Sequence, residues 1–275
     1  MTTTVEEEAQ SQEQPAPESK RPARARRPRP RGMWRVVHIL GWVFVWLGLA
    51  VLWFAVYTLW GTRAQTEAAQ RELQQQLQER IDTFAAIQSS TAPTPEQQQA
   101  MIAAVTADIA RAGPTDGVAR IRIPKLGLSA VVVNGTERES LQHGPGLFDV
   151  NLGDGVVPIP AVPGNTTIAG HRTTFGAEFN RIDELVPGDE IYLDTVAGTT
   201  AYSVIGQQVV DPMDVSVALQ YGDSRLTLST CNPKFSARTR LIVTAKMTAG
   251  PFMGMPPPPA DPLPAPDAQL PAAGG

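Results

Sequence analysis

The chain has little of the chemistry on which most metal, cofactor and disulfide proteins depend. It contains one cysteine, Cys231, and three histidines in 275 residues. A lone cysteine excludes a disulfide within the chain, and these few residues lack the clustered spacing of zinc ligands. The sequence also has no glycine-rich phosphate loop and no G-x-S-x-G motif, which marks a nucleophilic serine on a sharp turn. We therefore expect neither a metal nor a cofactor.

Charged residues are absent between Val36 and Trp60, a stretch long enough to cross a bilayer, which takes about 20 apolar residues. The alternative is a cleaved signal peptide, but such a peptide has an apolar core of only about 7 to 15 residues. We therefore expect residues 36–60 to form a retained transmembrane helix.

Basic residues crowd the amino-terminal side of this stretch, from Lys20 to Arg35, whereas Arg63 alone follows it closely. Because Lys and Arg near a span stay in the cytoplasm, this asymmetry predicts a single pass through the plasma membrane, with the N-terminus cytoplasmic and the later domain extracellular. Nucleic-acid binding is a competing interpretation of an arginine-rich run. Its place beside the apolar stretch favours the orientation role, and we expect no nucleic-acid partner.

The segments outside the main domain differ in composition. Residues 1–35 lack apolar periodicity and are predicted to be a disordered cytoplasmic tail. Residues 61–117 are predicted to form an exposed helical stalk or linker and an N-terminal helix, and residues 250–275 a Pro-rich disordered tail, a spacer rather than a ligand for another domain. The stalk carries a short apolar stripe that leaves self-association open but is too short to indicate a coiled coil: Leu73, Leu77 and Ile81. The N-terminal helix should begin at Thr94-Pro95-Glu96-Gln97, a capping box, and end before Gly113-Pro114.

From residue 118 to 249 the sequence consists of short Val, Ile and Leu runs separated by Gly, Pro and Asp. This pattern is typical of an all-β domain, and several runs alternate apolar and polar side chains. We expect a closed or nearly closed antiparallel barrel, because closure removes exposed strand edges. Pro124 should break the first two strands apart.

Cys231 and His171 each end a predicted strand, in RLTLSTC and TTIAGH respectively, so both should lie on the barrel rim. An unpaired exported thiol can bridge molecules, lie buried and inert, or act as a nucleophile whose proton an imidazole accepts. His38 lies at the membrane and His143 in a Gly- and Pro-rich loop. Of the two arginines that follow the cysteine, Arg240 directly precedes the strand LIVTA, and its guanidinium suits an oxyanion. Taken singly, each residue could have a structural role instead: a buried apolar cysteine, a structural histidine or a solvated surface arginine.

Read together, these segments resemble the sortase family from about Val118 to Thr248. The similar blocks are IRIPKLGL, the GPG at 144–146, AGHRTTFGAEFNRIDELVPGDEI and LTLSTCNPKFSARTRLIV. GHRTT and CNPKFSARTR are most similar to class E sortases of high-GC Gram-positive bacteria. The sequence departs from many relatives at Leu147-Phe148, where they carry His-Tyr, and in a longer insert that runs to Pro163.

The resemblance implies an eight-stranded sortase-type β-barrel with short helices and a cysteine transpeptidase activity. It implies catalytic roles for His171, Cys231 and Arg240. The implied partners are secreted proteins with an LAXTG- or LPXTG-like C-terminal sorting signal, cleaved between Thr and Gly through a Cys thioester, and the amine of a cell-wall precursor, lipid-linked peptidoglycan.

Two other functions stay open from the residues alone. One is a membrane-tethered β-barrel that binds a wall component without catalysis. The other is an L,D-transpeptidase, although its His-Gly-containing cysteine motif is missing here.

Overall fold

The computed structural model describes residues 31–57, 62–85, 93–148 and 159–261. The predicted cytoplasmic tail lies almost entirely outside this part of the chain, as do residues 262–275 of the predicted Pro-rich tail. The chain divides into two compact units, Met1–Ala50 and Val51–Gly275.

Helix α1, Arg31–Val56, contains the apolar stretch identified in the sequence. From Trp34 onward its side chains are exposed, including the tryptophans and leucines that soluble proteins bury. It is the one helix of the described residues that is long and apolar enough to cross a membrane.

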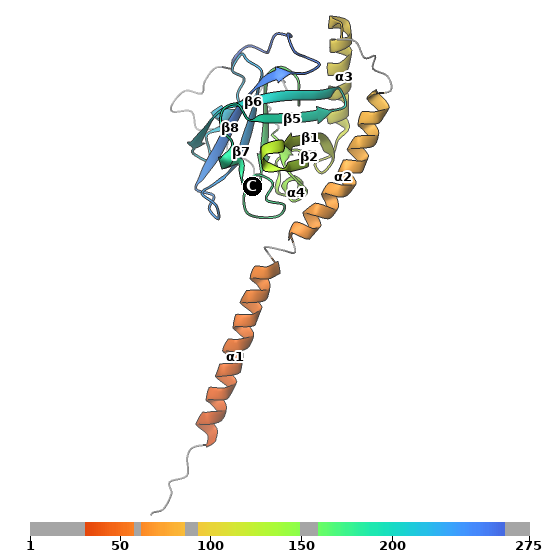
Figure 1. Cartoon of the computed structure of the whole chain (residues 1–275). Coiled ribbons are helices and arrows are strands. Elements are labelled where there is room, and N and C mark those ends of the chain that lie inside the picture. Colours follow the sequence, from red (N-terminus) through yellow and green to blue (C-terminus); the bar gives the residue numbers. More distant parts are fainter. Residues whose placement is uncertain (1–30, 58–61, 86–92, 149–158, 262–275) are drawn as a thin grey trace, which may run out of the picture. The chain divides into compact units, whose positions relative to one another are not determined.

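Eight strands close into a barrel in the order β1-β2-β3-β4-β7-β8-β6-β5, which confirms the predicted fold class (Figure 1). The strands are β1 Gly117–Ile123, β2 Leu128–Asn134, β3 Gly146–Leu147, β4 Asn165–Gly170, β5 Glu190–Thr195, β6 Gly198–Val210, β7 Arg225–Asn232 and β8 Thr239–Ala249. The short connecting helices are η2 Pro124–Leu126, α4 Arg138–Leu141, η3 Ile182–Glu184 and η4 Val215–Ala218. Pro124 separates β1 from β2, as the sequence predicts, because proline cannot continue the ladder.

The expectation of an antiparallel barrel is wrong at two strand pairs. β2 with β3, and β4 with β7, pair in parallel. Parallel neighbours need long connections, and here the chain between β4 and β7 crosses through β5, β6 and η4. The consequence for function is that β4 and β7 end at the same side of the barrel.

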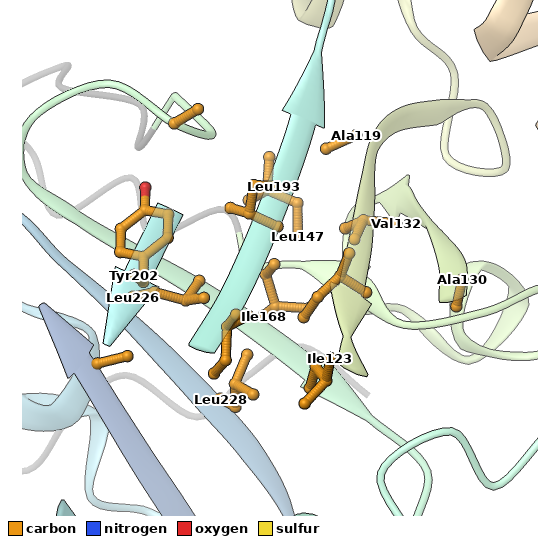
Figure 2. Packing of buried hydrophobic residues seen from close by; sticks show 14 of the residues in the cluster. Ala119, Ile123, Ala130, Val132, Leu147, Ile168, Leu193, Tyr202, Leu226 and Leu228 are labelled. Atoms are coloured by element: carbon orange, nitrogen blue, oxygen red, sulfur yellow. The ribbon is translucent and has the colours of Figure 1, made fainter. Parts of the chain in front are cut away.

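The barrel interior is filled by side chains from every wall. Leu147, Ile168, Leu193, Leu226 and Leu228 are each at most 2% exposed and pack against one another (Figure 2). Burying a side chain of this size contributes about 1.5–3 kcal/mol. The interior is therefore a packed core, and a substrate site must lie at the rim.

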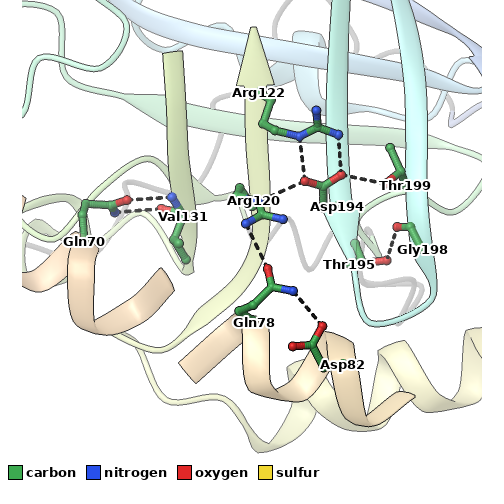
Figure 3. Close-up of polar contacts among 10 residues, drawn as sticks. All are labelled: Gln70, Gln78, Asp82, Arg120, Arg122, Val131, Asp194, Thr195, Gly198 and Thr199. Atoms are coloured by element: carbon green, nitrogen blue, oxygen red, sulfur yellow. Dashed lines mark hydrogen bonds and ion pairs between the residues drawn. The ribbon is translucent and has the colours of Figure 1, made fainter. Parts of the chain in front are cut away.

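A charged cluster lies where β1 meets β5, at the seam that closes the barrel (Figure 3). Asp194 accepts hydrogen bonds from Arg122, at 2.8 Å through both Nε and Nη2, from Arg120 Nε at 3.0 Å and from Thr199 Oγ1 at 2.7 Å. Burial raises the pKa of Asp194, but these hydrogen bonds outweigh it, so that its pKa is lowered overall. The carboxylate thus stays ionised while it holds the two strands together.

Helix α2, Thr62–Ala85, packs on the barrel and is not the exposed stalk that its polar composition predicts. Leu73 and Leu77, which are 7% and 1% exposed, lie against Val131 and Val133 of β2. The apolar stripe is therefore covered within the same chain. Self-association through these two leucines is not available while α2 is docked.

Gln70 of α2 acts like an extra strand residue beside β2 (Figure 3). Its Oε1 accepts from the Val131 backbone N at 2.6 Å, and its Nε2 donates to the Val131 O at 2.9 Å and to the His143 O at 2.8 Å. A Cβ at Gly144 would lie 2.2 Å from Gln70 Nε2. The first glycine of the GPG motif therefore leaves room for α2 to dock.

Helix α3, Pro95–Arg111, begins with the capping box predicted at Thr94 and Gln97. Its buried residues Val105 and Ile109 join the barrel core. Asp108 forms an ion pair with Arg80 of α2 at 3.0 Å, which ties the two helices to each other.

The first part of the predicted Pro-rich tail differs from the expectation, because residues 250–261 lie against the barrel. Phe252 is fully buried in the core, and the Pro251 carbonyl accepts a hydrogen bond from Gln98 Nε2 at 3.0 Å. Asp261 accepts from the Gln220 backbone N at 2.7 Å, and its own backbone N donates to the Gln220 O at 2.9 Å. Burial of Phe252 and these hydrogen bonds together hold a segment whose composition is otherwise that of a spacer.

Candidate functional site

The parallel pairing of β4 with β7 brings His171 and Cys231 to adjacent positions. Gly170 and Thr230 are the last partners in this ladder, and Thr230 Oγ1 donates to the Gly170 O at 2.7 Å. His171 follows Gly170 in the chain, and Cys231 follows Thr230. Both candidate residues therefore lie at strand ends on one side of the barrel, as the sequence predicts.

Arg240 reaches the same place through the antiparallel pairing of β7 with β8, in which it is the direct partner of Cys231. Directly opposite residues project on one face, with Cβ atoms about 4.5–5.5 Å apart. Arg240 Nη1 donates to the Ala237 O at 3.2 Å and to the Thr239 O at 3.3 Å, which leaves Nη2 and Nε free of any hydrogen bond to the described residues. Arg238 is exposed on the turn.

All three candidate residues line one pocket of about 270 Å³. One wall is apolar, with residues from the end of β6, the segment after it and β8: Val210, Pro212, Val215, Val217 and Ile242. Other lining residues are polar, among them Thr136, Asp214 and Ser229. The other two candidates, His143 and Arg238, are not among the lining residues.

His171 is held on two sides. Its Nδ1 lies 3.2 Å from Thr174 Oγ1, and its ring packs on Phe175 with centroids 4.8 Å apart. Burial lowers the pKa of His171 below its ordinary value of 6.5, because a charged imidazolium is poorly solvated there. The ring is therefore neutral near pH 7, the form that can accept a proton from a thiol.

The chemistry that these three side chains can perform together is acyl transfer. The thiolate form of Cys231 is a nucleophile, His171 can carry a proton, and Arg240 supplies a permanent positive charge in the same pocket. Among the described residues no group of three or more His, Cys, Asp or Glu side chains is arranged to hold a metal ion.

Arg172 also belongs to the site, although the sequence does not single it out. It stands next to His171 in the chain, yet its side chain is only 5% exposed and reaches the backbone at Cys231. Its place directly after His171 in the GHRTT block is the one sequence feature that could have indicated this role. The contact itself depends on the parallel β4–β7 pairing, which the sequence did not indicate.

The chain is similar to known proteins over this domain. Residues 121–248 match the family model described as Sortase domain. Sortase SrtE1 of Streptomyces coelicolor is 28% identical over 219 residues, 76% of this chain and 56% of that protein. Sortase D of Bacillus subtilis is 30% identical over 122 residues, 44% of this chain and 56% of that protein. The chain thus spans little more than half the length of these two curated relatives.

A solved structure shows the same fold. The Sortase D5 transpeptidase of Clostridium perfringens covers 66% of this chain and 99% of its own, with a TM-score of 0.51 and 24% identity. The similarity to Sortase SrtE1, and to Sortase SrtE2 of the same organism at 24% identity over 78% of this chain, is consistent with a class E-like sequence. Residues 121–248 of this chain are a sortase domain.

Proposed function

We propose that this chain is a membrane-anchored cysteine transpeptidase, with Cys231 as nucleophile, His171 as proton carrier and Arg240 as the stabiliser of negative charge. The observation that carries the proposal is the single pocket that these three side chains line. The sortase domain at residues 121–248 and the likeness to class E relatives support it.

The substrate is the C-terminal sorting signal of a secreted protein, of the LAXTG or LPXTG kind. Neutral His171 takes the proton of the Cys231 thiol as Sγ attacks the carbonyl carbon of the signal's Thr. The negative charge that develops on the carbonyl oxygen faces the Arg240 guanidinium. The Thr–Gly C–N bond then breaks as His171 gives its proton to the departing glycine amine. The products of this half-reaction are a Cys231 thioester and a released peptide that begins with glycine.

The second half-reaction consumes the thioester. His171 accepts a proton from an incoming amine, whose nitrogen attacks the thioester carbonyl. The C–S bond breaks and an amide forms. The departing sulfur of Cys231 takes the proton from His171, which restores the thiol and the neutral ring. We propose that the amine belongs to a cell-wall precursor, lipid-linked peptidoglycan.

We further propose that α1 is a single-pass plasma-membrane anchor with the N-terminus in the cytoplasm and the barrel outside. The basic residues from Lys20 to Arg35 before the apolar stretch support this orientation. The apolar composition and exposed side chains of α1 support its place in a bilayer.

Mass spectrometry of the protein mixed with an LAXTG peptide tests this function. We expect a covalent adduct on Cys231 that hydroxylamine releases, and no adduct on Cys231→Ala. Uncleaved LAXTG and LPXTG peptides with no adduct, together with saturable binding of a wall fragment, would favour the non-catalytic barrel instead.

A further inference from the structure

A buried arginine links the strand ends that carry the candidate residues. Arg172 Nη1 donates to the Cys231 backbone O at 3.3 Å and to Asn232 Oδ1 at 2.6 Å. Its Nη2 forms an ion pair with Asp183 at 3.1 Å, and its backbone O accepts from Asn180 Nδ2 at 2.7 Å. One planar guanidinium therefore spans from the residue after His171 to the peptide that follows Cys231.

The contacts continue from Asn232 to the third strand. Asn232 Nδ2 donates to Thr239 Oγ1 at 3.2 Å, and Thr239 Oγ1 donates back to the Asn232 O at 2.9 Å. Thr239 precedes Arg240 in the chain. Each member of this chain of contacts is thus the immediate neighbour of a candidate catalytic residue: Arg172 of His171, Asn232 of Cys231, and Thr239 of Arg240.

The environment of Arg172 favours one fixed conformation. The side chain is 5% exposed, and its Nε has no hydrogen-bond partner among the residues that the structure describes. Asp183, its carboxylate partner, is 41% exposed. Burying a guanidinium is costly unless its charge is paired and its N–H groups are bonded. Because Arg172 is buried with one N–H unbonded to any described residue, its burial is costly. A stabilising role alone therefore does not explain it.

We infer that Arg172 is a positioning residue for the site, and that it acts through Asn232 and Thr239 to set the placement of Cys231 against His171 and Arg240. A misplacement of even about 1 Å at reacting atoms lowers the rate of a positioned reaction strongly. A lysine at 172 keeps the positive charge but offers no rigid fork, so it cannot hold two acceptors in fixed geometry. This inference rests on the proposed acyl transfer. It adds Arg172, Asn232 and Thr239 to the three side chains that are proposed to react.

The test compares Arg172→Lys and Asn232→Ala with the unaltered protein. For each, the rate of thioester formation on an LAXTG peptide is measured against peptide concentration and pH, together with the melting temperature. We expect kcat to fall roughly ten- to hundred-fold in Arg172→Lys and to fall also in Asn232→Ala, because hydrogen bonds to a charged group are lost. KM should change little, because neither side chain lines the pocket. The double variant should lose less than the product of the two single effects, because the residues share a bond.

Arg225→Lys is the matched control. Arg225 begins the same strand, β7, and makes a two-pronged ion pair with Asp223 at 2.6 and 2.7 Å, but it does not touch the pocket. We expect its kcat to equal that of the unaltered protein. Equal kcat and pH dependence in Arg172→Lys, Asn232→Ala and Arg225→Lys would overturn the inference. If Arg172→Lys does not fold, an unchanged kcat in Asn232→Ala would also overturn it.

Alkylation of Cys231 by iodoacetamide separates this inference from the proposed function, since it needs no sorting signal. If the unaltered protein forms no thioester, the proposed function is contradicted, but the positioning role of Arg172 is not. The dependence of alkylation rate on pH should still differ between Arg172→Lys and Arg225→Lys, because His171, Arg240 and Asp214 line the pocket with the sulfur and Arg172 sets its distance from them. Identical alkylation profiles would contradict the role of Arg172.

Discussion

Cys231 on β7 and Arg240 on β8 are direct partners across an antiparallel ladder, and the partners beside them, Thr230 with Leu241 and Asn232 with Thr239, continue the same register. The spacing of sulfur and guanidinium therefore depends on the backbone of two paired strands. The turn between the strands carries Phe235, which is 83% exposed.

Replacing Arg240 with Ala should lower kcat/KM by about 10²- to 10³-fold, the effect of losing one donor to an oxyanion. Arg238→Ala is the control, because Arg238 is exposed and does not line the pocket. Thioester formation followed by mass spectrometry measures both variants. A larger loss in Arg238→Ala than in Arg240→Ala would reverse the assignment of the two arginines.

Replacing His171 with Ala should lower turnover by about 10²- to 10⁴-fold, the range for a general acid or base. Because burial lowers the pKa of His171 below 6.5, the neutral ring should persist in the unaltered protein to a pH below that value. The rate of thioester formation should accordingly fall only on the acid side of 6.5. His143→Ala, outside the pocket, should leave turnover unchanged.

The lowered pKa of His171 also makes the free energy of unfolding depend on pH. A depressed pKa in the folded protein means that the unfolded chain binds the extra proton first as pH falls through 6.5. The free energy of unfolding of the unaltered protein should therefore decrease below that pH by more than that of His171→Gln. Parallel curves from urea unfolding at several pH values would rule out a buried neutral imidazole.

Glu178 should make the protein less stable as the pH rises. Its carboxyl oxygens are buried and have no well-formed hydrogen bond within the described residues. Burial raises its pKa from 4.5 to about 7, partly opposed by its own backbone N–H and then by the charge of Arg63. Between these values the folded protein keeps a proton that the unfolded chain has released. The free energy of unfolding should thus fall as the pH rises from 4.5 to about 7, by on the order of 3 kcal/mol, and level off above.

Glu178→Gln removes the ionisation but keeps the shape of the side chain. Its melting temperature should exceed that of the unaltered protein at pH 8 and approach it at pH 5. Glu79→Gln, at an exposed position of α2, should follow the unaltered protein throughout. A Glu178→Gln curve that tracks the unaltered protein at every pH would show that the carboxyl is solvated.

Leu77→Ala should loosen the docking of α2 on the barrel. Leu77 is 1% exposed against Val131 and Val133, so its truncation leaves a cavity and should cost about 2–5 kcal/mol of unfolding free energy. Gln75→Ala, exposed on the same helix, is the control and should change stability little. Urea unfolding and hydrogen exchange over residues 62–85 measure the effect. Equal stability of the two variants would mean that α2 is a free stalk.

Local signals in the sequence predicted local structure well. The capping box at Thr94, the strand break at Pro124 and the strand-end positions of Cys231 and His171 depend on residues close together in the chain, and each is confirmed. The predictions that were wrong concern which segments pack against the barrel. The polar surface of α2 concealed two leucines that β2 buries, and Phe252 anchors a segment that is otherwise Pro-rich.

The sequence by itself determined the apolar stretch that could span a membrane, the barrel class and the three residue types suited to acyl transfer. Only the tertiary structure decided that β4 and β7 run parallel, and hence that Arg172 lies behind Cys231 rather than in solvent. The physical reason is that strand order and direction follow from which apolar faces close one barrel. That is a property of all eight strands together, and no single stretch of residues encodes it.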